Sequence, residues 1–386
     1  MKIKFSWKTL RKTTGFFVLL SLSCASSLKF PSMDFKKQDT DWRSFRDGQH
    51  NPGARDTDIT APLKLLWKKK IGPGYSTSLI LDQMVITGSV ERKIAFLKLG
   101  SGDKIDSYSL SFPISVTPCA DESILYFSEG KASSALSALN LKSGNLIWEK
   151  KFRGTGSSPV ISGNMLFIGT DSSLFCLDKM KGEIIWKFET GGNVYSTPAF
   201  SDDALYFGST DRKIYCLEKS SGKPDWCYET QGAVYASPCI GDESLFWGST
   251  DGYFYALGLV QGEFLWKYKS GGSIYSSAAR DKGKVFFGSN DGCLYALFTE
   301  DGSLAWKFET DGPIRSSPII AGEMLFFGSL DGNFYGLNSS NGEMVFKYES
   351  GGMLYASPSF SQGKVLISST DGYLYCFGKG GKKDGK

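Results

Sequence analysis

Four aspartates at intervals of 40 residues have a type and spacing that could do chemistry. Asp251, Asp291, Asp331 and Asp371 each precede a glycine. A ring of equivalent carboxylates could hold calcium or transfer protons. The same pairs also suit tight turns, because Asp accepts hydrogen bonds from nearby backbone N–H groups and a type I′ hairpin needs the positive φ that Gly adopts freely. We favour the turn, since each pair separates two short apolar segments.

Histidine and cysteine chemistry is sparse. The single histidine, His50, excludes a histidine-based triad within the repeats and any site with several histidine ligands, and we interpret it as structural. Cys176, Cys216 and Cys376 occupy repeat positions that hold Ala or Gly elsewhere, which favours buried free thiols. A Cys216–Cys227 bond across one hairpin is the alternative. The sequence therefore predicts no catalytic residue and no metal ligand.

Residues 1–23 are predicted to be a signal peptide of the lipoprotein type. Five basic residues and no acidic residue precede the apolar run at 15–22, which is too short to span a bilayer. Cys24 follows a small residue, as in a bacterial lipobox, although Ser21 occupies the usual Leu position. We predict lipidation at Cys24. The alternative is an ordinary signal peptide cleaved near Ser23 or Ala25.

The charge balance outside the leader excludes a polyanion-binding protein. Five of the 44 basic residues lie in the leader, so the rest of the chain, with 40 acidic residues, is nearly neutral. Binding of nucleic acid is therefore not expected. The mean hydropathy of −0.19 excludes a polytopic membrane protein. Residues 24–60 are polar and aperiodic and are predicted to be a tether and lead-in segment. Residues 379–386 are predicted to be a basic flexible tail.

A repeat with a period of about 40 residues determines the fold class. The segment GEIIWKFETGG at 182–192 returns in similar form at 262–272, 302–312 and 342–352. A degenerate position at Asp106 brings the series to eight. Such a period is typical of propellers and solenoids. The aromatic residues that mark the repeat are Trp67, Trp148, Trp186, Trp226, Trp266, Trp306 and Phe346.

Each period contains four short β-rich segments separated by turn residues, which predicts the four antiparallel strands of a propeller blade. The repeats begin with a lone strand around Trp67 and end with three strands at 354–377. Pairing that first strand with the last three would complete an eighth blade. We therefore predict an all-β fold, an eight-bladed β-propeller closed in this way, over residues 61–378.

One series of equivalent positions is a candidate binding site. The first strand of each blade should line the central channel, so the residue three positions before the strand's Pro slot should form a ring at one level. Five tyrosines and one arginine are predicted to form a channel rim that binds a peptide, a sugar or a flat ligand. The alternative is a packing role. In blade order, the series is Tyr75, Ser115, Gly156, Tyr195, Tyr235, Tyr275, Arg315 and Tyr355.

The blade pattern resembles the PQQ-type repeat of quinoprotein-like propellers over residues 61–378. The segments SALNLKSGNLIWEKKF at 137–152 and SPVISGNMLFIGTDSSLFCLD at 158–178 carry the resemblance. It implies that the marker aromatics dock between neighbouring blades. Trp42, Phe45, His50 and Gly53 are similar to the short lead-in that precedes such propellers.

Two kinds of protein share this repeat. The quinoprotein dehydrogenases bind PQQ and calcium with a vicinal disulfide and long inserted loops, whereas this chain has no adjacent cysteines and short blades. The resemblance to lipoproteins of the BamB type implies a non-catalytic, monomeric scaffold in the cell envelope, anchored in the outer membrane and facing the periplasm. Its partners would be envelope proteins, for example the machinery that assembles outer-membrane β-barrels, and no cofactor is expected. The alternatives are a PQQ-binding oxidoreductase or degenerate quinone binder, and a glycan- or ligand-binding propeller.

Overall fold

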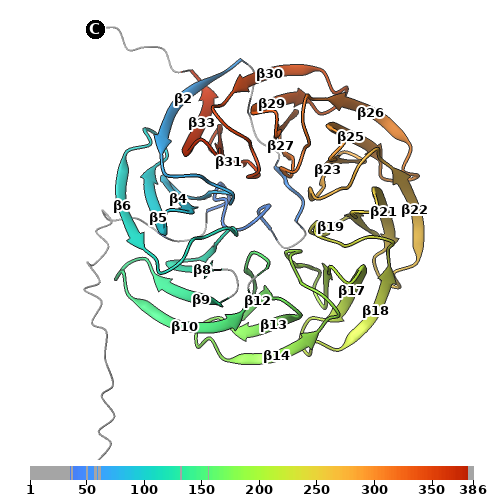
Figure 1. Cartoon of the computed structure of the whole chain (residues 1–386), viewed down its shortest axis with the longest axis horizontal. Helices are drawn as coiled ribbons and strands as arrows, with labels where there is room; N and C mark the ends of the chain where they lie inside the picture. Colours follow the sequence, from blue (N-terminus) through green and yellow to red (C-terminus); the bar gives the residue numbers. More distant parts are fainter. Residues whose placement is uncertain are drawn as a thin grey trace, which may run out of the picture.

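The chain forms a closed ring of eight sheets around a central axis (Figure 1). The computed structural model describes residues 35, 38–48, 51–55, 59, 62–130, 133–154 and 156–380. These residues form strands and no helix, so none of them belongs to a helix long and apolar enough to cross a membrane. The prediction of an all-β propeller with eight four-stranded blades is confirmed.

In each blade, four antiparallel strands lie side by side, with the first strand nearest the axis and the fourth at the outer wall. The first four blades contain β3 (Leu79–Leu81), β4 (Met84–Ser89), β5 (Lys93–Lys98) and β6 (Lys104–Ser109); β7 (Cys119–Asp121), β8 (Ile124–Gly130), β9 (Ser133–Asn140) and β10 (Leu146–Arg153); β11 (Val160–Ser162), β12 (Met165–Gly169), β13 (Ser173–Asp178) and β14 (Ile184–Glu189); β15 (Ala199–Phe200), β16 (Ala204–Gly208), β17 (Lys213–Glu218) and β18 (Pro224–Glu229).

The other four blades repeat this plan. They contain β19 (Cys239–Ile240), β20 (Ser244–Gly248), β21 (Tyr253–Gly258) and β22 (Phe264–Lys269); β23 (Ala279–Asp281), β24 (Lys284–Gly288), β25 (Cys293–Phe298) and β26 (Leu304–Glu309); β27 (Ile319–Ala321), β28 (Met324–Gly328), β29 (Asn333–Asn338) and β30 (Met344–Glu349); β31 (Ser359–Ser361), β32 (Lys364–Ser368), β33 (Tyr373–Lys379) and β2 (Leu63–Lys70). The second and third strands of each blade are largely buried, and their side chains form the hydrophobic core between neighbouring blades.

Strand β2 closes the ring, as the sequence predicts. It pairs antiparallel with β33, and Trp67 lies opposite Cys376. The eighth blade therefore combines the first repeat strand with the last three. Backbone hydrogen bonds between the two ends of the repeat region hold the ring together.

The Asp-Gly hairpins form, but their turn type differs from the predicted type I′. Gly252 has a φ of 79°, whereas Asp251 is not among the residues with positive φ. The Gly252 N–H donates to the Ser249 carbonyl and the Ser249 N–H donates to the Tyr253 carbonyl, both at 3.1 Å. This is a type I turn followed by a left-handed glycine. Asp251 keeps an ordinary φ because its Oδ1 accepts the Tyr253 N–H at 2.8 Å.

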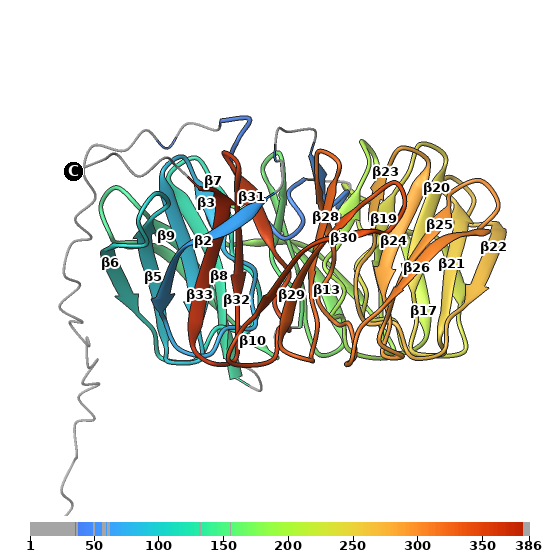
Figure 2. The same ribbon diagram turned by 90° about the horizontal axis from the view of Figure 1, so that it is seen from above.

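The described residues between 38 and 55, which we call the lead-in, cross one face of the ring and enter its centre, at the top of Figure 2. Trp42 is 1% exposed and forms an isolated bridge with Ile80 of β3. The short strand β1 (Ala54–Arg55) pairs in parallel with β27. The lead-in therefore joins blades that lie on different sides of the axis.

Candidate functional site: an axial cup

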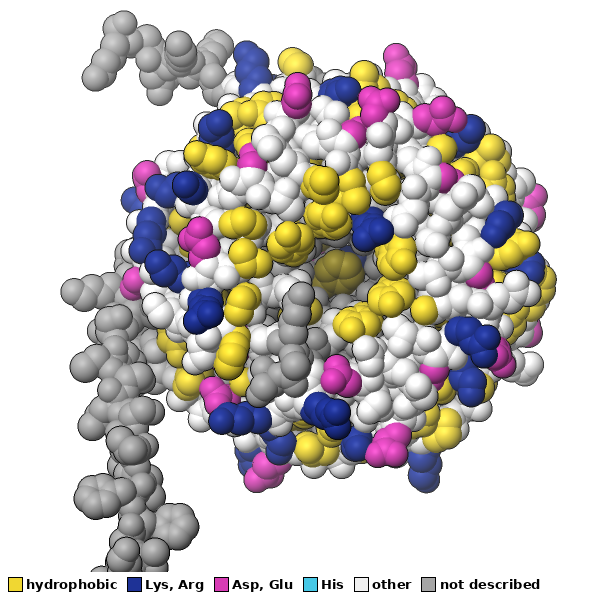
Figure 3. All heavy atoms as spheres, viewed as in Figure 1, with side chains coloured by type: hydrophobic (Ala, Val, Ile, Leu, Met, Phe, Trp, Pro, Cys, Tyr) yellow, Lys and Arg dark blue, Asp and Glu magenta, His cyan; other side chains and the backbone are white. Residues whose placement is uncertain are grey.

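A hollow of about 200 Å³ lies on the axis of the ring. Figure 3 shows hydrophobic side chains gathered around a central hollow. All eight positions of the predicted rim line it, together with Phe45 and one Ser or Thr from each blade. The rim residues precede the first strand of each blade, whereas the lead-in contacts the far ends of first strands at Asp82 and Gly322. The rim and the lead-in are therefore at opposite ends of the axis, and we call the hollow between them the axial cup.

Three consecutive tyrosines and Arg315 form a continuous arc of the rim. The rings of Tyr195 and Tyr235 stack with centroids 5.3 Å apart and an interplanar angle of 14°, and Tyr235 contacts Tyr275 at 5.2 Å. The Arg315 guanidinium lies 4.8 Å from the Tyr275 ring centroid, and its Nε donates to Asn290 Oδ1 at 3.1 Å. Burial and the neighbouring phenols raise the pKa of Tyr235, so this phenol is a proton donor at neutral pH.

The rim is interrupted on one side. Tyr75 and Tyr355 contact each other at 5.6 Å, but the positions of the second and third blades are Ser115 and Gly156. A Cβ atom on Gly156 would lie 2.5 Å from the Val194 carbonyl oxygen, so a side chain is sterically excluded there. The two rim positions of blades two and three therefore lack a large side chain, as predicted. At Gly156 the neighbouring backbone also prevents one from being accommodated.

A ring of hydroxyls lies two residues below the rim. In seven successive pairs of blades, the backbone N–H of this Ser or Thr donates to the hydroxyl of the next blade, at distances from 2.8 to 3.3 Å. None of the seven accepting hydroxyls donates a hydrogen bond of its own to the described residues. The accepting residues are Thr117, Ser158, Thr197, Ser237, Ser277, Ser317 and Ser357. These residues hold the blades in register and still carry unused protons at the wall of the cup.

The lead-in forms the floor of the cup. Phe45 lines the hollow, and the neighbouring Arg46 is only 1% exposed. The Arg46 guanidinium donates to the carbonyls of Ala278, of Pro318 at 3.0 Å, and of Asn51 at 3.2 Å. Burial lowers the pKa of Arg46 to about 10, so the group is charged at neutral pH. Backbone carbonyls of two blades thus hold the lead-in across the axis.

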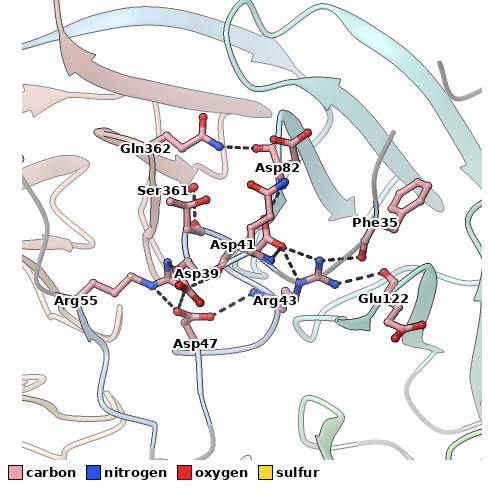
Figure 4. Close-up of polar contacts among 12 residues, drawn as sticks. Phe35, Asp39, Asp41, Arg43, Asp47, Arg55, Asp82, Glu122, Ser361 and Gln362 are labelled. Atoms are coloured by element: carbon pink, nitrogen blue, oxygen red, sulfur yellow. Dashed lines mark hydrogen bonds and ion pairs between the residues drawn. The ribbon is translucent and has the colours of Figure 1, made fainter. Parts of the chain in front are cut away.

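A second hollow, of about 980 Å³, lies beside the lead-in and is lined by it and by residues of blades two, three, four and eight or their loops. Figure 4 shows the polar contacts of the lead-in there. Most of the charged groups in the lining neutralise one another, and the remaining acid, Asp39, is exposed. The ion pairs are Arg43–Asp41 at 2.6 Å, Arg55–Asp47, and Lys179–Asp121 at 2.5 Å. Paired charges of this kind position the lead-in.

The repeated aspartates belong to turns and do not line the cup. Asp251 Oδ2 accepts the Tyr255 hydroxyl at 2.7 Å and the Gln231 N–H of the preceding blade at 3.0 Å. We call these contacts Asp–Tyr clamps. Burial, and then the hydrogen bond to the carboxylate, raises the pKa of each phenol. The clamps are Asp211–Tyr215, Asp251–Tyr255, Asp291–Tyr295, Asp331–Tyr335 and Asp371–Tyr375. The tyrosine partners of these aspartates were not predicted from the sequence, although an Asp-x-x-x-Tyr pattern recurs with the repeat.

The marker tryptophans lie between blades. A Cβ atom on Gly302 would lie 2.4 Å from the Trp266 ring of the preceding blade, so the ring packs directly on the glycine backbone. In five of these residues the indole N–H donates to a carbonyl of the next blade at 2.9 to 3.3 Å. The pairs are Trp67 and Leu99, Trp148 and Lys179, Trp186 and Lys219, Trp266 and Thr299, and Trp306 and Ser339.

Two markers depart from this pattern. The Trp226 indole N–H has no partner among the described residues, and the Tyr206 hydroxyl donates to Leu259, the carbonyl at the equivalent position, at 3.1 Å. Phe346 packs on Phe377 of the last blade, with ring centroids 5.3 Å apart. The last blade has no hairpin between its two outer strands, because these come from opposite ends of the repeats.

Two predicted residues, Cys24 and His50, lie outside the described residues. The other seven cysteines are free thiols. Cys216 lies opposite Trp226 and Cys227 lies opposite Tyr215, and the alternative Cys216–Cys227 bond is not formed. Burial raises the pKa of Cys216 to about 12, whereas Cys227 is exposed.

The cup does not fit a site for PQQ and calcium. Calcium binds carboxylate and carbonyl oxygens, usually with several carboxylates, but the described lining of the cup contains no Asp or Glu. Among the described residues, no group of His, Cys, Asp and Glu could hold a metal ion. No two cysteines of the chain are adjacent. The donor set of the cup consists of hydroxyls, phenols and one guanidinium, which suits binding of a ligand by hydrogen bonds.

Solved structures with the same fold include dehydrogenases and BamB. A europium-containing methanol dehydrogenase matches with a TM-score of 0.78 and 12% identity, over 89% of this chain and 98% of that chain. BamB from Moraxella catarrhalis matches with a TM-score of 0.70 and 19% identity, over 82% of this chain and 100% of that chain. A quinohemoprotein alcohol dehydrogenase from Comamonas testosteroni matches with a TM-score of 0.78 and 13% identity, over 91% of this chain and 82% of that chain. These likenesses concern the fold.

Comparison with curated proteins gave no match. A family model described as "Beta-alanine-activating enzyme, beta-propeller" matches residues 74–378. The matched segment begins at the rim of the cup and includes all eight blades except the closing strand β2. The chain therefore belongs to this β-propeller family.

Proposed function

We propose that this chain is a non-catalytic lipoprotein of the cell envelope that serves as a protein-interaction scaffold. In this proposal Cys24 carries the lipid anchor, the propeller faces the periplasm from the outer membrane, and the partners are envelope proteins. Assembly of outer-membrane β-barrels, in the manner of BamB, is the first process to examine. The export signal predicted for residues 1–23 and the fold shared with BamB support this proposal.

One observation carries the preference for binding over catalysis. The axial cup presents aromatic rings, hydroxyl protons and Arg315, and none of the described residues that line it carries a carboxylate, an imidazole or a thiol. General acid–base catalysis needs a group that titrates near the working pH, and nucleophilic catalysis needs a base beside the nucleophile. Rigid aromatic residues and arginine are instead the types that dominate binding energy at interfaces.

An affinity experiment tests the scaffold. Cells carrying the tagged protein are cross-linked, the envelope is solubilised in mild detergent, and the co-purifying proteins are identified. We expect a stoichiometric envelope protein, and recovery of a barrel-assembly protein would specify the process. A Cys24→Ser variant should leave the membrane fraction and lose this partner. A clean purification without a stoichiometric partner, or reduction of a dye by the purified protein with PQQ, calcium and an alcohol, would contradict the proposal.

A further inference from the structure

The axial cup has the shape to receive the end of a slim chain. It holds about 200 Å³, the rim opens on one face, and Phe45 of the lead-in closes the other end. Rim and hydroxyl ring are two residues apart, which along a strand is about 7 Å. A folded loop would not fit such a space, whereas a single side chain or a chain end would.

The wall of the cup carries many hydrogen-bond donors and few acceptors. Each of the seven linked hydroxyls already accepts an N–H from the preceding blade, and its own proton has no acceptor among the described residues. These residues are at most 9% exposed and line the hollow, so a ligand in the cup can accept hydrogen bonds from their hydroxyls. A group that only accepts hydrogen bonds complements this wall, and an ionised carboxylate is such a group.

The charge of the cup favours the same ligand. Among the described residues of the lining, only Arg315 is charged, and it forms no ion pair with any described carboxylate. The Arg315 guanidinium packs on the Tyr275 ring, and its Nε donates to Asn290. No described residue accepts a hydrogen bond from its two terminal nitrogens. A guanidinium fixed in this way can donate charge-assisted hydrogen bonds to a carboxylate at the mouth of the cup.

The interrupted rim provides a path for the rest of the ligand. The tyrosine arc can pack against apolar or backbone atoms, while the rim positions of blades two and three, Ser115 and Gly156, carry no large side chain. A chain whose end occupies the cup can leave over this gap. Building on the proposed scaffold function, we propose that the axial cup binds a carboxylate at the end of a slim segment of a partner protein, either its C-terminal carboxylate or an acidic side chain.

Titration calorimetry with three peptides tests this site on the full-length protein purified in detergent. The peptides are acetyl-Gly-Ser-Gly-Leu with a free carboxylate, the same peptide as a carboxamide, and acetyl-Gly-Asp-Gly-Leu-amide. We expect the free carboxylate to bind at least about 10-fold more tightly than its carboxamide, since a hydrogen bond to a charged group contributes about 1.5–3 kcal/mol, equivalent to about 10- to 150-fold. Binding of the aspartyl peptide alone would identify a side chain as the source and also support the site.

Matched variants separate the cup from the rest of the molecule. Arg315→Gln should abolish the preference for carboxylate over carboxamide, whereas Arg212→Gln, another exposed arginine at a turn near the same face, should preserve it. Ser115→Tyr should fill the gap and weaken binding of the free carboxylate. Equal binding of all three peptides, an unchanged carboxylate preference in Arg315→Gln, or no binding of any peptide at millimolar concentration would overturn the inference. If the envelope partner still co-purifies with Arg315→Gln, the scaffold stands and only the cup is excluded.

Discussion

Replacing Arg46 by methionine is expected to release the lead-in from the ring while the blades stay folded. Methionine keeps much of the stem but donates no hydrogen bond, so the carbonyls of Ala278 and Pro318 lose their partner. Both carbonyls lie where the lead-in crosses the axis. The ring itself is held by β2 and by the contacts between blades, which the substitution does not touch.

The size of the effect follows from the two hydrogen bonds that join Arg46 to the ring, because its third acceptor, Asn51, belongs to the lead-in itself. A hydrogen bond to a charged group contributes about 1.5–3 kcal/mol net of desolvation, so the two together contribute about 3–6 kcal/mol. The cost of burying the guanidinium, which lowers the pKa of Arg46 to about 10, is part of that net value. We therefore expect docking of the lead-in to weaken by about 3–6 kcal/mol.

Amide hydrogen exchange measures this local opening. The Trp42 N–H donates to Ile80 at 2.8 Å and the Ile320 N–H donates to Gly53 at 2.7 Å, so both become accessible when the lead-in leaves. Their exchange should accelerate by about 100-fold to more than about 10,000-fold. The control Arg212→Met, at an exposed arginine, should change neither amide. Unchanged exchange at both amides in folded Arg46→Met would refute the idea that these hydrogen bonds hold the lead-in.

Three further outcomes are expected. The Asp–Tyr clamps raise phenol pKa values in the native state, so above pH 10 the unfolded chain releases protons that the native one keeps. The free energy of unfolding should then fall by up to about 1.4 kcal/mol per pH unit for each clamp, and replacing the five tyrosines by Phe should flatten this slope in alkaline urea titrations. Gly262→Ala places a Cβ 2.4 Å from Trp226 and should lower stability by about 2–5 kcal/mol, whereas Gly163→Ala, with positive φ but open space, should lose only about 1–2 kcal/mol; equal losses would exclude the ring contact as the cause. Among the described thiols, only Cys227 should react with a thiol reagent before unfolding, and fast labelling of a second one would contradict the assigned burial.

The fold was predictable because similar turn and strand sequence patterns recur along the repeats. Asp-Gly turns, the marker aromatics and alternating apolar segments each predict one hairpin, and 40-residue spacing places them in equivalent positions. Ring closure also followed, since the first repeat contributes only a strand around Trp67 and the last lacks one. The predicted turn type was wrong because the Asp251 side chain accepts a hydrogen bond from the Tyr253 N–H, and this contact determines the conformation of the turn.

The closed end of the cup could not be predicted, because the lead-in has no repeat to reveal its place. Arg46 is an ordinary polar residue in sequence, and only the fold brings the carbonyls of Ala278 and Pro318 to it from more than 200 positions away. The gap in the rim was visible as a break in the tyrosine series. Its cause at Gly156 was not, since the clash comes from the backbone of Val194.

The pairing of the first and last strands of the propeller allows the ring to be circularly permuted. Leu63 lies opposite Lys379, where every other blade has a hairpin between its outer strands. A turn joining residues 380 and 62, with new termini in the hairpin at 179–183, should give a circularly permuted protein with the same eight blades. The lead-in would then be a separate peptide that can be added to the ring, and its affinity for the far end of the axis could be measured directly.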